Sequence, residues 1–169
     1  MRNLEYKARI DDLESYRAKA LEIGAEPKGV LSQTDTYFQV LAGRLKLRET
    51  PGRDGELIYY QRDENGIDRA SDYEVFPTTD PAALRDLLAG ALGVIATVSK
   101  RRTLLLLDGS RIHLDNVDGL GNFLELEVPV QEDDAPASDK INRLLAELGL
   151  TWQECIRASY LDLTRETQL

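Results

Sequence analysis

Charged residues recur at every second position along several short segments of this chain. Basic residues alternate with leucines over 44–48 and occupy positions 100 and 102, whereas Glu125 and Glu127 alternate with leucines. Because successive side chains of a strand point to opposite faces, each segment presents its charges on one face. Lys and Arg bind phosphate oxygens, and carboxylates bind a hard divalent cation. The pattern therefore indicates chemistry on a small polyphosphate held together with Mg²⁺ or Mn²⁺.

The first segment of the chain shows the same alternation without a break. Its apolar face holds Leu4, Tyr6, Ala8 and Ile10, and its polar face holds Asn3, Glu5, Lys7 and Arg9. Such a segment is typical of a strand with one face in the core. Glu5 and Lys7 thereby join the carboxylates and amines that the pattern places on charged faces.

The elements that must position these residues are mostly strands. Alternation and turn residues predict strands over 3–10, 33–40, 44–49, 56–62, 71–76, 94–100, 102–107, 110–117 and 122–130, with turns at 51–55 and 63–66. Apolar stripes that end at Gly24, Gly93 and Gly149 predict three helices. The tail over 152–163 is expected to hold a short helix and a last strand. The hairpin-like spacing favours an antiparallel sheet in an α+β fold.

Two architectures fit this order. In one, an open sheet packs its apolar face on the helices and leaves its charged face in water. In the other, about eight strands close into a barrel with a polar interior and the helices outside, a size that encloses one small ligand. Positive charge concentrated on a few strands repels itself unless an anion or nearby carboxylates compensate it. This concentration favours the closed eight-stranded antiparallel β-barrel.

Length and composition set the outer bounds. The 169 residues suit a single domain over 1–169, and 21 Lys and Arg against 30 Asp and Glu give a net charge of -9. That charge argues against binding to extended nucleic acid or an anionic membrane, although it leaves room for a small enclosed polyanion. The single cysteine excludes an intrachain disulfide and a thiol-rich metal cage, and the single histidine argues against a His-based zinc site or a Ser-His-acid triad. The absence of a signal-like or membrane-spanning segment predicts a cytoplasmic protein.

The charged segments, taken in their order along the chain, resemble motifs of the CYTH family of triphosphate tunnel enzymes. The family is named for class IV adenylyl cyclases and thiamine triphosphatases. The first strand matches the family's Glu-x-Glu-x-Lys signature at Glu5 and Lys7, with Asn3 in place of the first glutamate. Lys100 and Arg102 fit its Lys-x-Arg element. Further matches lie at 33–38 and 44–48, and those to the cyclase-like branch lie at 113–127 and 159–163. The resemblance thus covers nearly the whole chain.

The resemblance implies a triphosphate tunnel in which basic residues grip the substrate and acidic residues hold one or two cations. It assigns phosphate binding to Lys7, Arg48, Lys100 and Arg102; strand alternation or charge adds Lys46, Arg62 and Arg111, and more loosely Arg44 and Arg69. The metal, Mg²⁺ or Mn²⁺, is expected on Glu5, Glu125 and Glu127, with Asp115 as a further candidate. Lys7 and Glu127 are the expected catalytic residues.

Three positions leave alternatives open. Asn3 keeps an oxygen but loses a charge, which would weaken or remove one metal site. Arg62 stands where many members carry a phosphate-binding lysine, and Arg is not a simple replacement for Lys. His113 alternates with Arg111 and Asp115, so it either contacts phosphate or fills a structural position.

Three functions follow from the resemblance. The first is a cyclase that converts ATP to cyclic AMP and pyrophosphate. The second is a hydrolase of inorganic triphosphate, thiamine triphosphate or a nucleoside triphosphate, and the third is a non-catalytic module that binds a polyphosphate or nucleotide. The motifs favour cyclase-like, metal-dependent chemistry first and hydrolysis second, and similarity to class IV cyclases suggests a homodimer by analogy.

Overall fold

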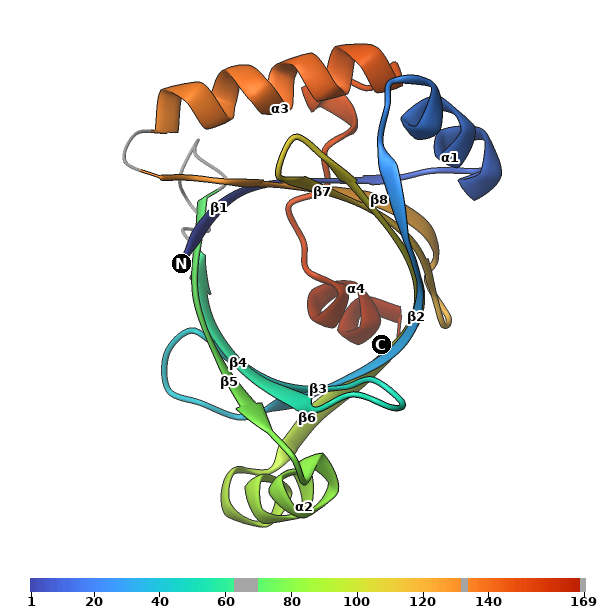
Figure 1. Cartoon of the computed structure of the whole chain (residues 1–169). Helices are drawn as coiled ribbons and strands as arrows, with labels where there is room; N and C mark the ends of the chain where they lie inside the picture. The colour runs from blue at the N-terminus through green and yellow to red at the C-terminus, as the bar shows by residue number, and fades with distance from the viewer. Residues whose placement is uncertain (63–69, 132–133, 168–169) are drawn as a thin grey trace.

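The computed structural model describes residues 1–62, 70–131 and 134–167 and contains eight strands and four α-helices (Figure 1). The strands are β1 (Arg2–Arg9), β2 (Glu26–Phe38), β3 (Arg44–Glu49), β4 (Gly55–Arg62), β5 (Ala70–Thr78), β6 (Val94–Leu107), β7 (Ser110–Val117) and β8 (Gly121–Pro129). The helices are α1 (Leu13–Glu22), α2 (Pro81–Leu92), α3 (Asp134–Leu148) and α4 (Tyr160–Thr167), with a 3₁₀ turn at Trp152–Glu154. The turn predicted at 63–66 lies outside the described residues.

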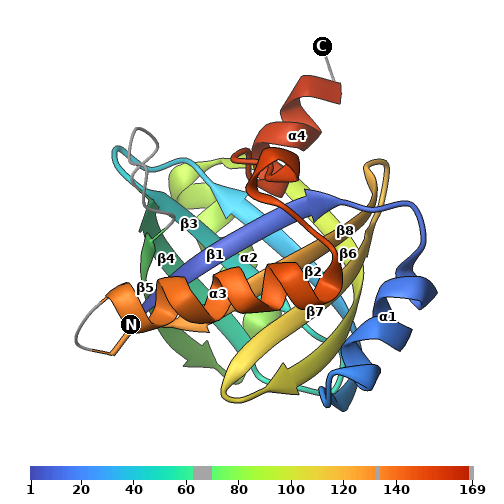
Figure 2. The ribbon, with the colours of Figure 1, turned by 90° about the horizontal axis from the view of Figure 1, so that it is seen from above.

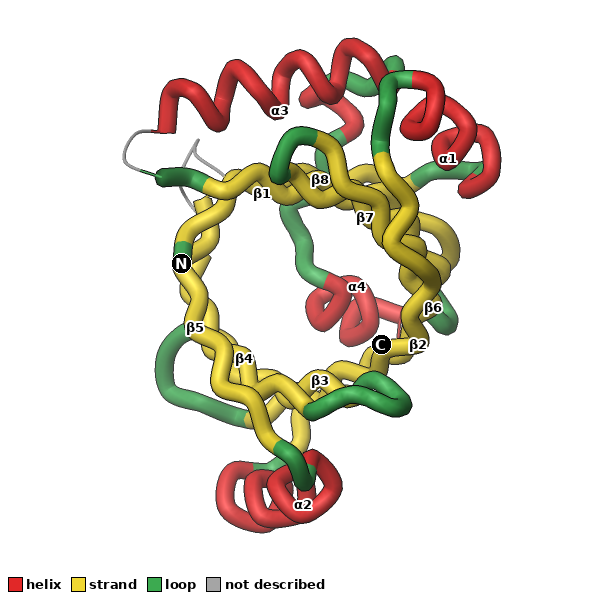
Figure 3. Tube along the Cα trace, viewed as in Figure 1, coloured by secondary structure: helices red, strands yellow, loops and turns green. Residues whose placement is uncertain are grey.

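The eight strands pair in a ring. Their order is β1-β5-β4-β3-β2-β6-β7-β8, and β8 pairs with β1 again, so hydrogen-bonded neighbours run all the way round. Every pair is antiparallel. Figure 3 views the molecule down this ring, with α1 and α3 on one side and α2 on the other. The predicted eight-stranded antiparallel sheet and the α+β class are confirmed.

The outer faces of β1, β7 and β8 form the main apolar core beneath α1 and α3. Leu4, Tyr6 and Ala8 pack there with the leucines of β7 and β8, all nearly inaccessible to solvent. Helix α3 meets them with an apolar stripe at helical spacing, namely Ile141, Leu144, Leu145 and Leu148. Because strand side chains alternate, burying these residues outward turns the charged residues of the same strands into the ring.

Two strands are longer than the sequence predicts. Residues 94–107 form one continuous strand, β6, although the alternation predicts separate strands over 94–100 and 102–107. Its partner β2 begins at Glu26 rather than at Gln33, and the two pair along their whole length. Proline and glycine usually interrupt a strand, and here the pairing of β2 with β6 shifts register between Pro27 and Gly29 and then continues.

The tail differs from its prediction. The last strand expected within 152–163 does not form, and helix α4 begins at Tyr160 instead. The Asp162 carboxylate accepts hydrogen bonds from the backbone N–H and hydroxyl of Ser159, the residue just before the helix. Unlike the other helices, α4 lies at one end of the ring (Figures 1 and 2). Tyr160 and Leu161 are buried there against Phe123, in a second apolar core that fills this end of the interior.

Among the described residues, no helix has the length and apolar character needed to cross a membrane.

Candidate functional site

The interior of the ring holds a cavity of about 750 Å³. Its lining comes from all eight strands and from the segment 156–162. Small-molecule sites in proteins have volumes of this order. The cavity is unusual in its charge, because inward-facing basic and acidic side chains form two clusters on its wall.

The first group, the Asp35 cluster, consists of Asp35 on β2, Lys46 and Arg48 on β3, and Lys100 on β6. Arg48 donates to both carboxylate oxygens of Asp35, at 2.8 and 2.9 Å. Lys46 and Lys100 each place Nζ 3.0 Å from Asp35 Oδ2. The strand register brings these residues together. Asp35 pairs directly with Arg48 on β3, and Gln33, the preceding residue on the same face of β2, pairs with Lys100 on β6. One carboxylate thus holds three cations.

Burial controls the charge states in the Asp35 cluster. Burial raises the pKa of Asp35, but Arg48, Lys100 and Lys46 outweigh it and hold that pKa well below its usual range. Burial lowers the pKa of Lys100 to about 7, against the opposing effect of Asp35. Burial also lowers the pKa of Lys46. With all three cations protonated, the four residues carry a net charge of +2, which suits a phosphate chain.

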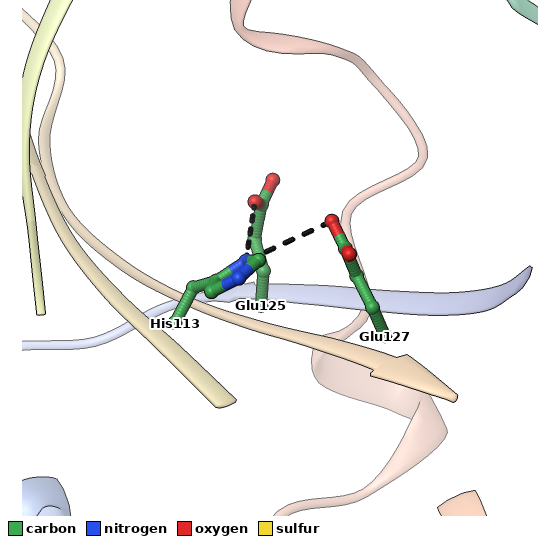
Figure 4. Close-up of side chains that lie close together, drawn as sticks. All are labelled: His113, Glu125 and Glu127. Atoms are coloured by element: carbon green, nitrogen blue, oxygen red, sulfur yellow. Dashed lines mark ion pairs between the residues drawn. The ribbon is translucent and has the colours of Figure 1, made fainter. Parts of the chain in front are cut away.

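The second group, the histidine–glutamate cluster, consists of His113 on β7 and of Glu125 and Glu127 on β8. One donor atom from each residue can be chosen so that all three lie within 4.8 Å of one another. His113 pairs directly across the sheet with Glu125, and Glu127 is the next residue on the same face of β8. Figure 4 shows the imidazole facing both carboxylates, with an ion-pair contact to each.

Basic residues surround this cluster and keep its carboxylates ionised. Lys7 Nζ lies 3.2 Å from Glu125 Oε1, Arg102 Nη2 lies 2.5 Å from Glu125 Oε2, and Arg111 Nη2 lies 2.6 Å from Glu127 Oε2. Burial raises the pKa of Glu125, but Lys7 and Arg102 outweigh it and hold that pKa well below its usual range. For Glu127, burial is outweighed by His113 and Arg111, which lower its pKa to about 2.

These residues fit a divalent cation. Metal ligands must be deprotonated, and both glutamates are ionised at neutral pH. The His113 Nδ1 atom is buried without a hydrogen-bond partner in the described part of the chain. Two anionic oxygens and one imidazole nitrogen are common ligands of divalent metals. Glu5, also a predicted ligand, lines the same cavity and pairs across the sheet with Glu127.

Asp115, the fourth predicted ligand, has different neighbours. It is fully buried and accepts two hydrogen bonds from Arg102, at 2.7 and 2.5 Å. The Tyr160 hydroxyl donates a third, at 2.8 Å. These contacts make Asp115 a support for Arg102 and α4, and its role in metal binding stays a prediction.

The remaining predicted phosphate ligands also face the cavity where the structure describes them. Lys7 donates to the Ala158 backbone oxygen at 3.2 Å and lies 4.1 Å from the Tyr160 ring centroid. Arg44 pairs with Asp162, at 3.0 Å, and with the Ser159 hydroxyl. The side chain of Arg62 and all of Arg69 lie outside the described part of the chain.

Asn3, which replaces the first glutamate of the motif, is buried at the edge of the cavity. With its amide turned so that both ends find partners, Asn3 Oδ1 accepts from Arg111 Nη2 at 2.9 Å. The same guanidinium pairs with Glu127. Asn3 therefore contacts a basic residue next to the histidine–glutamate cluster.

Sequence reasoning missed Asp35 and Tyr160 as members of the site. Asp35 shares the inward face of β2 with Gln33 and Tyr37, and a lone carboxylate on that face was the available signal. Tyr160 lies in the tail over 152–163, where the sequence predicts a short helix and a last strand, and nothing in those elements indicates its contact with Asp115. His113 was considered for phosphate contact or a structural role, and the structure places it beside two carboxylates.

A family model of the CYTH domain matches residues 1–160, so the chain belongs to the CYTH family. No curated protein sequence matches the chain. The family defines a triphosphate tunnel fold, and its members are typically adenylate cyclase-like enzymes or triphosphatases. The ring of strands and its charged interior are consistent with that family.

Solved structures share the fold at low sequence identity. A Pyrococcus horikoshii protein matches with a TM-score of 0.85 and 23% identity, over 95% of this chain and 98% of that one. A candidate adenylate cyclase from Vibrio parahaemolyticus matches with a TM-score of 0.77 and 20% identity, over 96% and 97%. A candidate adenylyl cyclase from Hippeastrum is described as having a dominant triphosphatase activity. It matches with a TM-score of 0.66 and 14% identity, over 99% of this chain and 97% of that one.

Proposed function

We propose that the protein binds a triphosphate together with a divalent cation inside the ring, and that it converts ATP to cyclic AMP and pyrophosphate. The observation that carries this proposal is the convergence of the Asp35 cluster and the histidine–glutamate cluster on one cavity. The first cluster carries positive charge suited to phosphates. The second carries ionised carboxylates that would hold a divalent metal beside the phosphates.

In this proposal, the basic residues bind and orient the phosphate chain. Lys46, Arg48 and Lys100 exchange part of their pairing with Asp35 for phosphate oxygens. Arg102, two residues from Lys100 on β6, and Arg111 on β7 exchange part of their pairing with Glu125 and Glu127 in the same way. Arg62 remains a proposed contributor at the end of β4. A fixed array of cations stabilises charge that develops as phosphate bonds break, without a cost for reorganising solvent.

Glu125 and Glu127 would hold the cation, together with Glu5, and Asp115 remains a further candidate. When bound, Mg²⁺ or Mn²⁺ neutralises phosphate charge and polarises phosphate oxygens. Lys7 and Glu127 are assigned to the reacting centre, because Lys7 Nζ and the Glu127 carboxylate flank Glu125 from β1 and β8. Lys7 offsets the charge of the reacting phosphate, and Glu127 orients the group that attacks it.

The lining of the cavity favours a triphosphate that carries an organic group. One part of its wall, on β2, β4 and β5, is apolar or aromatic and consists of Tyr37, Ile58, Tyr60, Tyr73 and Val75. An inorganic polyphosphate offers nothing for such a surface to bind, whereas a base or sugar does. This wall is the reason to rank a nucleotide cyclase before a hydrolase of inorganic triphosphate.

Hydrolysis is the second candidate, and a specific observation supports it. The Hippeastrum relative shares the fold and is described as having a dominant triphosphatase activity. A hydrolase needs the same phosphate and metal ligands and differs in using water as the attacking group.

The test incubates purified protein with ATP, inorganic triphosphate or thiamine triphosphate, plus Mg²⁺ or Mn²⁺, and identifies the products. Cyclic AMP with pyrophosphate supports the cyclase, and orthophosphate supports the hydrolase. Ligand-dependent thermal stabilisation without turnover indicates a binding module. Arg48→Ala removes a basic side chain inside the ring. Arg101→Ala is its matched control, because Arg101 precedes Arg102 on β6 and its side chain is exposed to solvent. A protein whose Tm responds to none of these triphosphates would contradict the proposal.

A further inference from the structure

His113 is buried in a position that leaves part of its imidazole unsatisfied. The residue is 4% exposed, and its Nδ1 atom has no hydrogen-bond partner within the described ranges. Nearly all buried polar atoms in folded proteins have such a partner. Nδ1 faces Glu125 Oε2 at 3.8 Å and Glu127 Oε1 at 3.7 Å (Figure 4). These are ion-pair distances for a protonated imidazole and are too long for hydrogen bonds. A neutral Nδ1 in the same place could share one cation with both carboxylates.

The separations suit a shared cation better than a hydrogen bond. A hydrogen bond between nitrogen and oxygen needs about 2.7–3.2 Å. Two donor atoms that each lie about 2.1 Å from one metal ion are roughly 3.0–4.2 Å apart, depending on the angle between them. Both distances from Nδ1 fall within that interval.

The two carboxylates remain able to accept a cation in this arrangement. Glu127 uses Oε2 for Arg111 and turns Oε1 toward His113. Glu125 uses Oε1 for Lys7 and Oε2 for Arg102. Each carboxylate oxygen has two lone pairs, so a metal can share an oxygen that already accepts a hydrogen bond.

We propose that His113 is a direct metal ligand through Nδ1, alongside Glu125 and Glu127, and that the site thereby prefers a transition-metal cation to Mg²⁺. Mg²⁺ favours oxygen ligands and retains its waters, whereas imidazole nitrogen is a good ligand for first-row transition metals. The inference rests on the proposed function for the presence of a metal. It adds a nitrogen ligand and a selectivity that the carboxylates alone do not supply.

Pulsed electron paramagnetic resonance on Mn²⁺ bound to the untagged protein, without any triphosphate, tests the inference. We expect a ¹⁴N coupling from a directly bound imidazole. The chain contains one histidine, so uniform ¹⁵N labelling of histidine assigns the coupling without a substitution. A ¹⁴N coupling that becomes a ¹⁵N coupling on labelling supports direct ligation by His113. Bound Mn²⁺ that shows no nitrogen coupling overturns it, and so does an absence of Mn²⁺ binding.

Metal affinities in His113→Gln test the selectivity, with Arg101→Gln as the matched surface control. We expect the Mn²⁺ Kd to rise at least about tenfold in His113→Gln, while the Mg²⁺ Kd changes less than about threefold. Equal changes for both metals, or none, overturn the selectivity. Weaker triphosphate binding with unchanged Mn²⁺ affinity would make His113 a phosphate ligand instead. The resonance and Mn²⁺-affinity measurements do not depend on turnover. A negative result in them can therefore be told apart from a negative result in the product assay, which tests the proposed function.

Discussion

The two charged clusters share one cavity but combine acidic and basic residues in different proportions. In the Asp35 cluster, one carboxylate holds Lys46, Arg48 and Lys100. In the histidine–glutamate cluster, two carboxylates face Lys7, Arg102 and Arg111 around an imidazole. The first has the larger excess of cations, three for one carboxylate, and suits phosphate. The second supplies anionic oxygens and a nitrogen, which suit a metal.

Burial adds a second difference. The side chains of Asp35 and Lys100 are each 1% exposed, whereas those of Glu125 and Glu127 are 16% and 21% exposed. Removing one partner from a buried ion pair leaves an uncompensated charge, which is more costly at a drier site. The comparison therefore predicts that the Asp35 cluster contributes more to stability and the histidine–glutamate cluster exchanges its partners more readily.

The largest expected effect is on stability. Asp35→Ala leaves the buried Lys100 and the partly buried Lys46 and Arg48 without their shared carboxylate, and we expect it to lower the free energy of unfolding by about 3–5 kcal/mol. Urea unfolding measures the change. Asp134→Ala is the control, because its pair with Arg2 is solvent-exposed and worth about 1 kcal/mol or less. Equal losses in both variants would remove the distinction between buried and exposed pairing.

The next effect is on ligand affinity. Arg48→Ala removes a guanidinium that donates two hydrogen bonds inside the cavity, and charge-assisted bonds of this kind are worth about 1.5–3 kcal/mol. We expect inorganic triphosphate to bind about 10- to 100-fold more weakly, as measured by calorimetry. Arg101→Ala should leave that affinity unchanged. If both variants bind like the wild type, the Asp35 cluster is not the phosphate site.

A smaller effect separates the clusters by pH. Burial lowers the pKa of Lys100 to about 7, so this lysine loses its charge as pH rises through neutrality. Between pH 7.5 and 9.5, we expect the affinity for triphosphate to fall by up to about tenfold per pH unit, the limit for one linked proton. Lys100→Arg should flatten the profile, because arginine stays protonated. A steep profile that persists in Lys100→Arg would assign the titration to another group.

The same pKa makes a prediction about the unliganded fold. Because the folded-state pKa of Lys100 lies below its ordinary value of 10.5, the unfolded chain binds more protons between pH 7 and 10.5. The contribution of Lys100 to stability should therefore rise with pH over that window. Urea unfolding of Lys100→Met at pH 7 and pH 10 measures it, and a difference from wild type that does not change with pH would contradict the assignment.

The smallest expected effect tests the link between α4 and the clusters. Tyr160→Phe removes one hydrogen bond to Asp115, which Arg102 still holds through two others. The cost should be about 1 kcal/mol of unfolding free energy. A loss several times larger would mean that Tyr160 positions Arg102, and through it Glu125, more strongly than these contacts indicate.

Much of this site follows from alternation along single strands. Within each of β1, β3 and β8, charged and apolar residues alternate. The sequence therefore predicts that the charged side chains of a strand lie on one face and that the apolar side chains between them enter a core. Leu4, Tyr6 and Ala8 do so, and Glu5 and Lys7 consequently line the cavity. Such reasoning needs only one segment at a time, and it identified most of the basic residues and both glutamates of the site.

What alternation did not reveal depends on register between distant segments. Asp35 lies 65 residues from Lys100, and only the β2–β6 pairing shows that they meet. His113 lies opposite Glu125 for the same reason. The helical state of 160–167 is supported by the local Ser159–Asp162 cap and by burial of Tyr160, and the second of these depends on contacts with distant segments.

A crystal of the protein soaked with Mn²⁺ and a non-hydrolysable ATP analogue tests the central claim most directly, with data collected at the manganese absorption edge. The two-cluster account predicts an anomalous peak within bonding distance of Glu125 and Glu127. It also predicts phosphate oxygens on Lys46, Arg48 and Lys100. Manganese or phosphate bound outside the ring, with the cavity unchanged, would contradict it.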